Sequence, residues 1–417
     1  MDNTILIRKS VPLEGEVKIS GAKNAAVAII PATVLARGCC VLDNVSPLTD
    51  VLSQCEILSS LGAKVQWLDA TTVSIDTAGV RNGTPPEELA GKLRASYYLM
   101  GAMLGRFGEA RIGLPGGCKI GPRPIDQHLK GFQALGCTWN IDNGNVLLQG
   151  NPMENGNVYF DLVTVGATIN VMLAAAGVKG TTIIENAARE PEIIDLANFL
   201  NKIGVVVKGA GTGTIRITGT GDRGCADHSI IPDRIEAGTF MIAAAATGGK
   251  VLVKDVIPRH LEPVTAKLRE SGVLIEEGDD WLRVLGPDRG RAIDIKTLPY
   301  PGFPTDLQQP LGAYLARCTG TSIITENIFE NRFRYVDELK RMGARIKVEG
   351  RVAVIEGVES LRGATVHSLD LRASSALVIA GLSARGLTKV GGVEHLHRGY
   401  YDFVGKLKGL GAEIELT

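Results

Sequence analysis

The segment LPGGCKIGPRP, residues 114–124, combines residue types that could perform chemistry. It places Cys118 after two glycines and ahead of Lys119 and Arg123. Neighbouring cations lower the pKa of a thiol from its ordinary value of about 8.5 and favour the reactive thiolate. A cysteine in a turn can equally be a small buried apolar residue. From these residues alone, both interpretations stay open.

Charged and polar side chains also stand where helices are predicted to begin. Helix N-termini present unpaired N–H groups and favour anions. An isolated arginine at such a place is commonly a solvated cap, but arginines at matched positions favour convergence on one anionic ligand. Asp306, in GFPTDLQQ, is a candidate base or hydroxyl-binding group, or simply a capping aspartate. The predicted helix starts lie at or near Lys23–Asn24, Arg94, Arg123, Thr164–Gly166, Glu190, Asp233–Arg234, Asp306, Arg332, Arg372 and Arg398.

The elements that position these residues recur along the chain. A helix-like stretch that ends in glycine and leads into a short strand occurs six times, about 70 residues apart. A second series of six segments is rich in alanine and apolar nearly all round, which is typical of helices buried on every side. Each unit therefore pairs a buried helix with an amphipathic surface helix. The glycines that close the surface helices are Gly62, Gly136, Gly204, Gly272, Gly343 and Gly411.

The two ends of the chain suggest the domain organisation. The sixth unit stops after one strand, whereas other units have further strands. The N-terminal segments ILIRK and EVKIS could supply what is missing. We therefore expect one domain of three units over residues 22–231, which includes the cysteine loop at 112–125. The second domain is expected to comprise residues 1–21 and 232–417.

Composition excludes several classes of protein. The 417 residues carry 45 basic and 45 acidic side chains, and this balance argues against a nucleic-acid or membrane-surface partner. The seven cysteines show no CxxC motif and no disulfide framework, which predicts a reduced cytoplasmic protein without a structural metal. The N-terminus lacks the apolar core of a signal peptide, and no apolar run is long enough to span a membrane.

Several motifs, taken in order, resemble one family. GAKNAA, LRAS, LPGGCKIGPRPID, VGATIN, PDRIEAGTF, FPTDLQ, ENRF, DLRAS and HRGY follow the pattern of bacterial UDP-N-acetylglucosamine 1-carboxyvinyltransferases, within the EPSP synthase superfamily. The resemblance covers essentially the whole chain. It implies an inside-out α/β barrel fold, with two domains of three repeated α/β units each.

The resemblance also implies a reaction. Family members move the enolpyruvyl group of phosphoenolpyruvate onto the 3-hydroxyl of UDP-N-acetylglucosamine, with release of phosphate, in the first committed step of peptidoglycan synthesis. The route is addition and then elimination through a tetrahedral ketal. No cofactor or metal is implied, and the expected partners are the two substrates.

Site residues follow from the same resemblance. Cys118 matches the general acid that also forms a phosphoenolpyruvate adduct and is alkylated by the epoxide antibiotic fosfomycin, and Asp306 matches the proposed base. Lys23, Arg123 and Arg398 match the cations that bind phosphoenolpyruvate, with Arg332 and Arg372 close to them. The positions that hold the UDP-sugar correspond to Asn24, Arg94, Arg123, Pro124, Ile125, Asp126, Gln127, Thr164, Val165, Gly166, Asp306 and Ile328.

Two positions depart from the family pattern, and two other functions compete with this one. Thr164 stands where serine is common and keeps the hydroxyl, and His397 replaces an aspartate usually found before Arg398. The nearest alternative is a sister enzyme that enolpyruvylates shikimate 3-phosphate, which has no counterpart of the PGGC loop. The other is a non-catalytic paralogue that binds UDP-sugars, against which the joint presence of Lys23, Cys118 and Asp306 argues.

Overall fold

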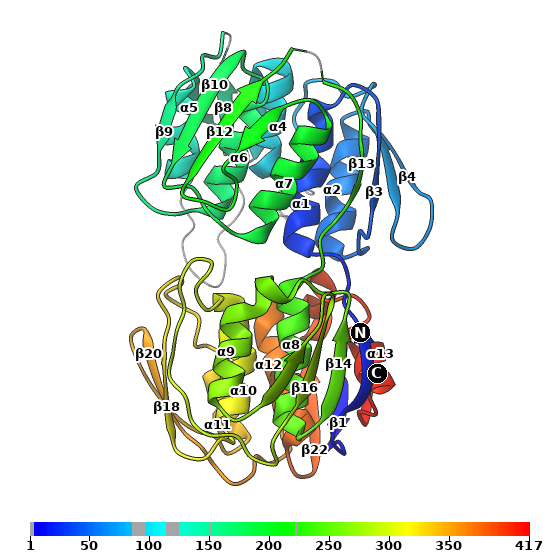
Figure 1. Cartoon of the computed structure of the whole chain (residues 1–417), viewed down its shortest axis with the longest axis vertical. Coiled ribbons are helices and arrows are strands. Elements are labelled where there is room, and N and C mark those ends of the chain that lie inside the picture. Colours follow the sequence, from blue (N-terminus) through cyan, green and yellow to red (C-terminus); the bar gives the residue numbers. More distant parts are fainter. Residues whose placement is uncertain (1–3, 86–96, 114–124, 151, 222) are drawn as a thin grey trace. The chain divides into compact units, whose positions relative to one another are not determined.

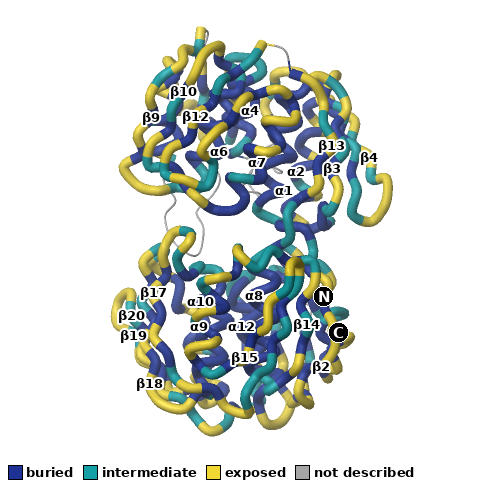
Figure 2. Tube along the Cα trace, viewed as in Figure 1, coloured by how far each residue is buried: buried dark blue, intermediate teal, exposed yellow. Residues whose placement is uncertain are grey.

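The chain folds into two compact units of mixed α/β structure. The computed structural model describes residues 4–85, 97–113, 125–150, 152–221 and 223–417. We call residues 21–231 the N-terminal unit, and residues 4–20 together with 232–417 the C-terminal unit (Figure 1). Within each unit, buried helices lie inside and strands and surface helices lie outside, so the fold is α/β as predicted (Figure 2).

Buried and surface helices alternate along the chain. The buried series consists of α1 (Lys23–Ala32), α4 (Tyr98–Phe107), α6 (Val165–Ala175), α8 (Arg234–Thr247), α10 (Thr305–Leu315) and α12 (Leu371–Ser383). The surface series consists of α2 (Thr49–Ser60), α5 (Asp126–Ala134), α7 (Pro191–Lys202), α9 (Glu262–Glu270), α11 (Val336–Arg341) and α13 (Phe403–Gly409). This alternation confirms the prediction drawn from the two sequence series.

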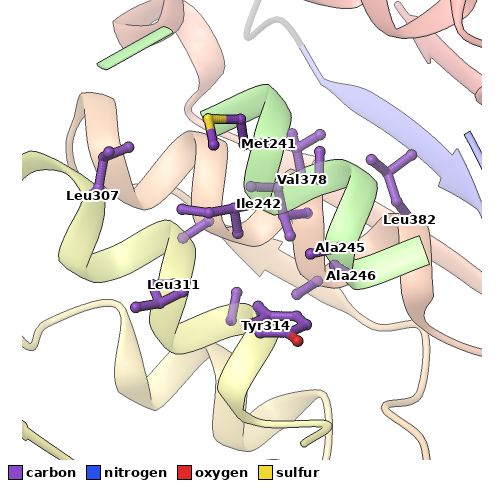
Figure 3. Close-up of a cluster of buried hydrophobic side chains, with 14 of the residues drawn as sticks. Met241, Ile242, Ala245, Ala246, Leu307, Leu311, Tyr314, Val378 and Leu382 are labelled. Carbon is purple, nitrogen blue, oxygen red and sulfur yellow. The ribbon is translucent and has the colours of Figure 1, made fainter. Parts of the chain in front are cut away.

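The core of the C-terminal unit lies between its three buried helices. α8 is buried at every position from Ile235 to Ala246. Its alanines allow α10 and α12 to approach closely, and the larger side chains Leu307, Leu311 and Val378 fill the space between the helices (Figure 3). Burial of a leucine-sized side chain contributes about 1.5–3 kcal/mol. An apolar surface all round the helix is therefore satisfied by packing on every side.

The strands form a repeated sheet in which an edge strand pairs in parallel with the second strand and the remaining pairs are antiparallel. The five four-stranded sheets have the orders β21-β22-β1-β23, β11-β12-β10-β9, β13-β3-β5-β4, β15-β16-β14-β2 and β17-β18-β20-β19. Among the described residues, the sixth sheet has the order β6-β8-β7. The N-terminal unit contains β3 (Cys39–Asp43), β4 (Lys64–Trp67), β5 (Val73–Asp76), β6 (Glu109–Gly113), β7 (Thr138–Asp142), β8 (Asn145–Gln149), β9 (Asn157–Tyr159), β10 (Gly180–Glu185), β11 (Val206–Lys208), β12 (Thr214–Gly219) and β13 (Asp227–Ser229). The C-terminal unit contains β1 (Ile5–Arg8), β2 (Glu14–Lys18), β14 (Lys250–Lys254), β15 (Leu274–Glu277), β16 (Trp281–Leu285), β17 (Ile295–Lys296), β18 (Thr321–Thr325), β19 (Arg345–Glu349), β20 (Val352–Glu356), β21 (Thr365–His367), β22 (Leu387–Gly391) and β23 (Ile414–Leu416).

The N-terminal strands join two different sheets. β1 lies between β22 and β23 and takes the third place in the sheet of the last repeat. β2 pairs in parallel with β14, which follows α8, although β2 itself precedes α1. β13 precedes α8 but pairs in parallel with β3, which follows α1. Neither β2 nor β13 therefore pairs with the strand that follows the next helix along the chain. Each pairs with a strand of its own unit.

Glycines close the surface helices. Each of the six predicted glycines has a positive φ, for example 104° at Gly62 and 98° at Gly272. Residues with a Cβ rarely adopt this conformation, whereas glycine reverses the chain there at little cost. The helix-ending role predicted for this series is confirmed.

Buried Arg223 ties together the C-terminal ends of three helical segments in the N-terminal unit. Its guanidinium donates to the carbonyl oxygens of Leu35 at 3.0 Å, Ala176 at 2.9 Å and Gly105 at 3.3 Å. Leu35 ends the 3₁₀ turn Thr33–Leu35, Ala176 follows helix α6, and Gly105 lies in the last turn of α4. Helix C-termini carry partial negative charge and unpaired carbonyls, so one buried cation satisfies all three.

Replacing Arg223 with methionine is expected to lower the free energy of unfolding by about 3–5 kcal/mol. Each carbonyl left buried without a partner costs about 1–3 kcal/mol. Urea denaturation followed by circular dichroism measures the loss. The matched control is Arg216→Met on the exposed face of β12, which should change stability by less than about 0.5 kcal/mol. Equal effects of the two substitutions would contradict a special role for Arg223.

Candidate active site

Asp306 lies in the first turn of α10, where it accepts from two arginines. Its carboxylate oxygens contact Arg332 at 2.5 Å and Arg372 at 2.9 Å. The N-cap residue of α10 is Pro304, so Asp306 does not take the capping position that the sequence left open. The side chain of Asp306 is 28% exposed, in contrast to 4% and 5% for Arg332 and Arg372. The carboxylate therefore stands between two buried guanidinium groups and the solvent.

The two arginines are fixed by their surroundings. Arg372 lies two residues after Asp370, whose carboxylate caps α12 by accepting from the backbone N–H of Arg372 and Ala373. Its guanidinium lies over the ring of Tyr400, with 5.3 Å to the centroid. Arg332 lies at the same distance from the ring of Phe329. Stacking on aromatic faces holds a guanidinium in one orientation, ready for an anion.

The charge and the unused donors of this group are suited to a further anionic acceptor. Burial is the largest single effect and lowers the pKa of Arg372, but Asp306, Tyr400 and Asp233 together outweigh it, and the net pKa is raised. Nε of Arg332 and Nη1 of Arg372 are buried and have no hydrogen-bond partner among the described residues. Buried N–H groups without a partner favour binding of a further acceptor.

Further predicted residues of the C-terminal unit come from neighbouring loops. Ile328 donates its backbone N–H to Glu326, in the segment that leads to Arg332. Arg398 ends the 3₁₀ helix η4 (Val393–Arg398), which packs against α12. His397, beside it, is exposed to solvent.

In the N-terminal unit, Lys23 begins α1 and pairs with a carboxylate. Its Nζ lies 3.4 Å from Asp50 Oδ2, and both side chains are largely buried. Asp50 comes from the first turn of α2, and α1 packs against α2. Asn24 follows Lys23 and is half-buried. The carboxylate beside Lys23 was not among the predicted residues, since no spacing in the sequence links positions 23 and 50.

A second polar group of this unit joins the starts of α5 and α6. Gln127 donates to Asp126 at 2.8 Å and to Asp161 at 3.1 Å, and accepts from the backbone N–H of Asp161. Lys130 also donates to Asp161 at 2.6 Å, and these bonds lower the pKa of the Asp161 carboxyl, first through Lys130 and then through Gln127. Ile125 occupies the N-cap position of α5, immediately before Asp126. Asp161 is another residue that sequence analysis missed.

The start of α6 lies close to α5. Thr164 is its N-cap residue, and its carbonyl accepts from the Thr168 hydroxyl at 2.8 Å. Val165 and Gly166 form the first turn, and a Cβ on Gly166 would lie 3.1 Å from the ring of His128. Glycine therefore allows the α6 terminus to approach α5. His128 in turn is hydrogen-bonded to Asn170 at 2.8 Å.

Comparison with known proteins places this arrangement in a family. The model of EPSP synthase (3-phosphoshikimate 1-carboxyvinyltransferase) matches residues 7–407. The chain belongs to the EPSP synthase family. It is 54% identical to UDP-N-acetylglucosamine 1-carboxyvinyltransferase 3 of Caldanaerobacter subterraneus and 52% identical to UDP-N-acetylglucosamine 1-carboxyvinyltransferase 2 of Clostridium acetobutylicum; each match covers 98% of both proteins.

Solved structures agree with this EPSP synthase family assignment. The enolpyruvyl transferase NikO from Streptomyces tendae superposes with a TM-score of 0.90 at 25% identity, covering 100% of this chain and 99% of that one. EPSP synthase from Acinetobacter baumannii gives a TM-score of 0.77 at 17% identity, with complete coverage of both chains, and shows the fold. The fold and family predicted from the motifs are confirmed.

The predicted site residues of this EPSP synthase family member fall into three groups. In the C-terminal unit, Asp306 accepts hydrogen bonds from both Arg332 and Arg372. In the N-terminal unit, Lys23 pairs with Asp50. Asp126 and Gln127 lie on α5, which packs against α6, the helix that begins with Val165 and Gly166. Cys118, Arg94, Arg123 and Pro124 lie outside the described residues.

The described residues include neither a candidate metal site nor a candidate membrane span. No group of three or more histidine, cysteine, aspartate or glutamate side chains there could hold a metal ion. Likewise, none of the helices described is both long and apolar enough to cross a bilayer.

Proposed function

We propose that this chain transfers the enolpyruvyl group of phosphoenolpyruvate to the 3-hydroxyl of UDP-N-acetylglucosamine and releases phosphate. The observation that supports this most directly is the Asp306 carboxylate held against two buried arginines at the start of α10. The relatives at 52–54% identity over 98% of the chain bear the name of this activity. The product would enter peptidoglycan synthesis in the cytoplasm.

Asp306 is proposed to act as the base for the attacking hydroxyl. While both guanidinium groups neutralise it, a carboxylate is a weak base. Phosphoenolpyruvate carries a carboxylate and a phosphate that compete for the same arginine donors. When the substrate draws Arg332 or Arg372 away, the basicity of Asp306 rises, and it can take the proton of the 3-hydroxyl. Substrate binding would thus switch the base on.

The chemistry then proceeds in two steps. The deprotonated hydroxyl oxygen bonds to C2 of phosphoenolpyruvate, while Cys118 donates its proton to the methylene carbon, and a tetrahedral ketal results. The ketal next loses a proton from its new methyl group as the C2–O bond to phosphate breaks, which restores the alkene. Nearby Lys and Arg favour the thiolate of free Cys118, and the charge of bound phosphoenolpyruvate favours the protonated acid.

Cations and amides are proposed to hold the two substrates. Lys23, Arg123 and Arg398 would bind the phosphate and carboxylate of phosphoenolpyruvate. Hydrogen bonds between a cation and an anion are stronger than those between neutral groups. The starts of α1 and α6 and the turn before α5 would bind the UDP-sugar. The residues proposed to bind the UDP-sugar are Asn24, Arg94, Arg123, Pro124, Ile125, Asp126, Gln127, Thr164, Val165, Gly166 and Ile328.

Phosphate release with two acceptors tests the function. The purified chain with phosphoenolpyruvate is expected to release phosphate when UDP-N-acetylglucosamine is added and to stay at background with shikimate 3-phosphate. The Cys118→Ser variant corrects for contaminating phosphatase. Release only with shikimate 3-phosphate would assign the sister activity. Tight UDP-N-acetylglucosamine binding without release would point to a non-catalytic paralogue.

A further inference from the structure

Three cysteines gather where β13 approaches β3. Cys39 and Cys40 are the first two residues of β3. β13 runs parallel to β3 with Asp227 opposite Val41, and Cys225 precedes β13 by two residues. A Cβ on Gly38 would lie 2.7 Å from Cys225 Sγ, so this thiol lies against the chain immediately before β3.

Within this group, Cys40 and Cys225 face each other. Cys40 is buried, and the Cys225 side chain and the backbone N–H of Ala226 are close enough to its sulfur to act on its pKa. Side chains alternate along a strand, so Cys39 points to the other face. There it is exposed, and its Sγ lies 3.0 Å from the hydroxyl of Ser74 on β5.

The two facing thiols differ in reactivity. Burial raises the pKa of Cys40 to about 12, so it is mostly a thiol at neutral pH. Cys225 is exposed and open to reagents in solution. Exposed thiols react first with oxidants, and a second sulfur in contact can then resolve the product. The buried Cys55 and Cys318, whose pKa values are also raised to about 12, have no such exposed partner among the described residues.

We propose that Cys225 and Cys40 form a reversible redox pair that closes a disulfide when the protein meets a peroxide. The Cys225 thiolate attacks one peroxide oxygen, the O–O bond breaks, and a sulfenic acid and water result. The Cys40 sulfur then attacks the Cys225 sulfur; the S–S bond forms, the S–O bond breaks, and a second water leaves. The two thiols supply two electrons, and the peroxide accepts them.

The surroundings of Cys40 favour closure of the disulfide. The proximity of the two side chains raises the effective concentration of Cys40 at Cys225, which offsets the low thiolate fraction of Cys40. The N–H of Ala226 also stabilises negative charge on the Cys40 sulfur. A disulfide there would tether β3 to the segment that enters β13, and a thiol reductant would release it.

Peptide mapping of the full-length wild-type protein tests the pair. The protein is treated with a small excess of hydrogen peroxide, remaining thiols are alkylated, and trypsin digestion is followed by mass spectrometry. We expect residues 38–64 linked to residues 224–234, with a loss of two hydrogen atoms and separation by dithiothreitol. The oxidised protein should also unfold at a higher temperature than the reduced protein, because the cross-link restricts the unfolded chain.

Three substitutions identify the partners. Cys225→Ser, at an exposed position, and Cys40→Ser should each abolish the link and the thermal shift. Cys39→Ser is the matched control and should retain both. Persistence of the link in Cys40→Ser, or peroxide-treated wild-type protein without a 38–64 to 224–234 link, would overturn the proposal. Because Cys225→Ser changes an exposed side chain, loss of the link in that variant reports chemistry rather than unfolding.

Discussion

Replacing Asp306 with asparagine is expected to lower kcat by about 10²–10⁴-fold, the usual contribution of a general base. The Michaelis constant for UDP-N-acetylglucosamine should change much less, because the amide can still contact a hydroxyl. The base removes the proton only as the reaction proceeds, so loss of the base lowers kcat. Steady-state phosphate release at varied sugar nucleotide concentration separates the two constants.

The structure suggests the controls for this substitution. Loss of the carboxylate leaves Arg332 and Arg372 buried without their anion, and breaking a buried pair costs about 3–5 kcal/mol. Circular dichroism must therefore show that the variant is folded at the assay temperature. Asp337→Asn is the matched control, since this aspartate is exposed on α11. Equal losses in kcat and in UDP-N-acetylglucosamine affinity would make Asp306 a binding residue only.

Replacing Cys118 with serine is expected to abolish most turnover and all covalent labelling. A hydroxyl is a far weaker acid than a thiol, so serine cannot protonate the methylene carbon effectively. Cys118→Asp should retain part of the turnover, because a carboxylic acid can donate a proton, but it should form no thioether with fosfomycin. Phosphate release measures the first property, and the intact mass after incubation with phosphoenolpyruvate or fosfomycin measures the second.

An exposed cysteine elsewhere serves as the control for Cys118. Cys39→Ser should leave turnover and labelling unchanged, since Cys39 contacts Ser74 on β5 and takes no part in the proposed chemistry. If wild-type protein acquires neither the phosphoenolpyruvate adduct nor the fosfomycin adduct on Cys118, the reactive-thiol interpretation is wrong.

The repeat was accessible from the sequence because its signals are local. Apolar residues all round a helix require burial whatever its neighbours are, and a glycine after an amphipathic helix indicates a positive φ. Short windows of sequence therefore predict the six helix-ending glycines, from Gly62 to Gly411, and the six helices of the buried series. Cys118 and Asp306 were singled out by their local motifs, and family resemblance supplied their expected roles.

Pairings over long separations were decided by the tertiary structure. β2 pairs with β14 and β13 pairs with β3, and both pairings join positions far apart in the chain. The same holds for the contact of Asp306 with Arg372, for Lys23 with Asp50, and for Cys40 with Cys225. Sequence periodicity states which face of an element is buried, but not which other element covers it. Those partners are chosen by packing and charge once the helices and sheets are assembled, because these interactions depend on distance in space rather than along the chain.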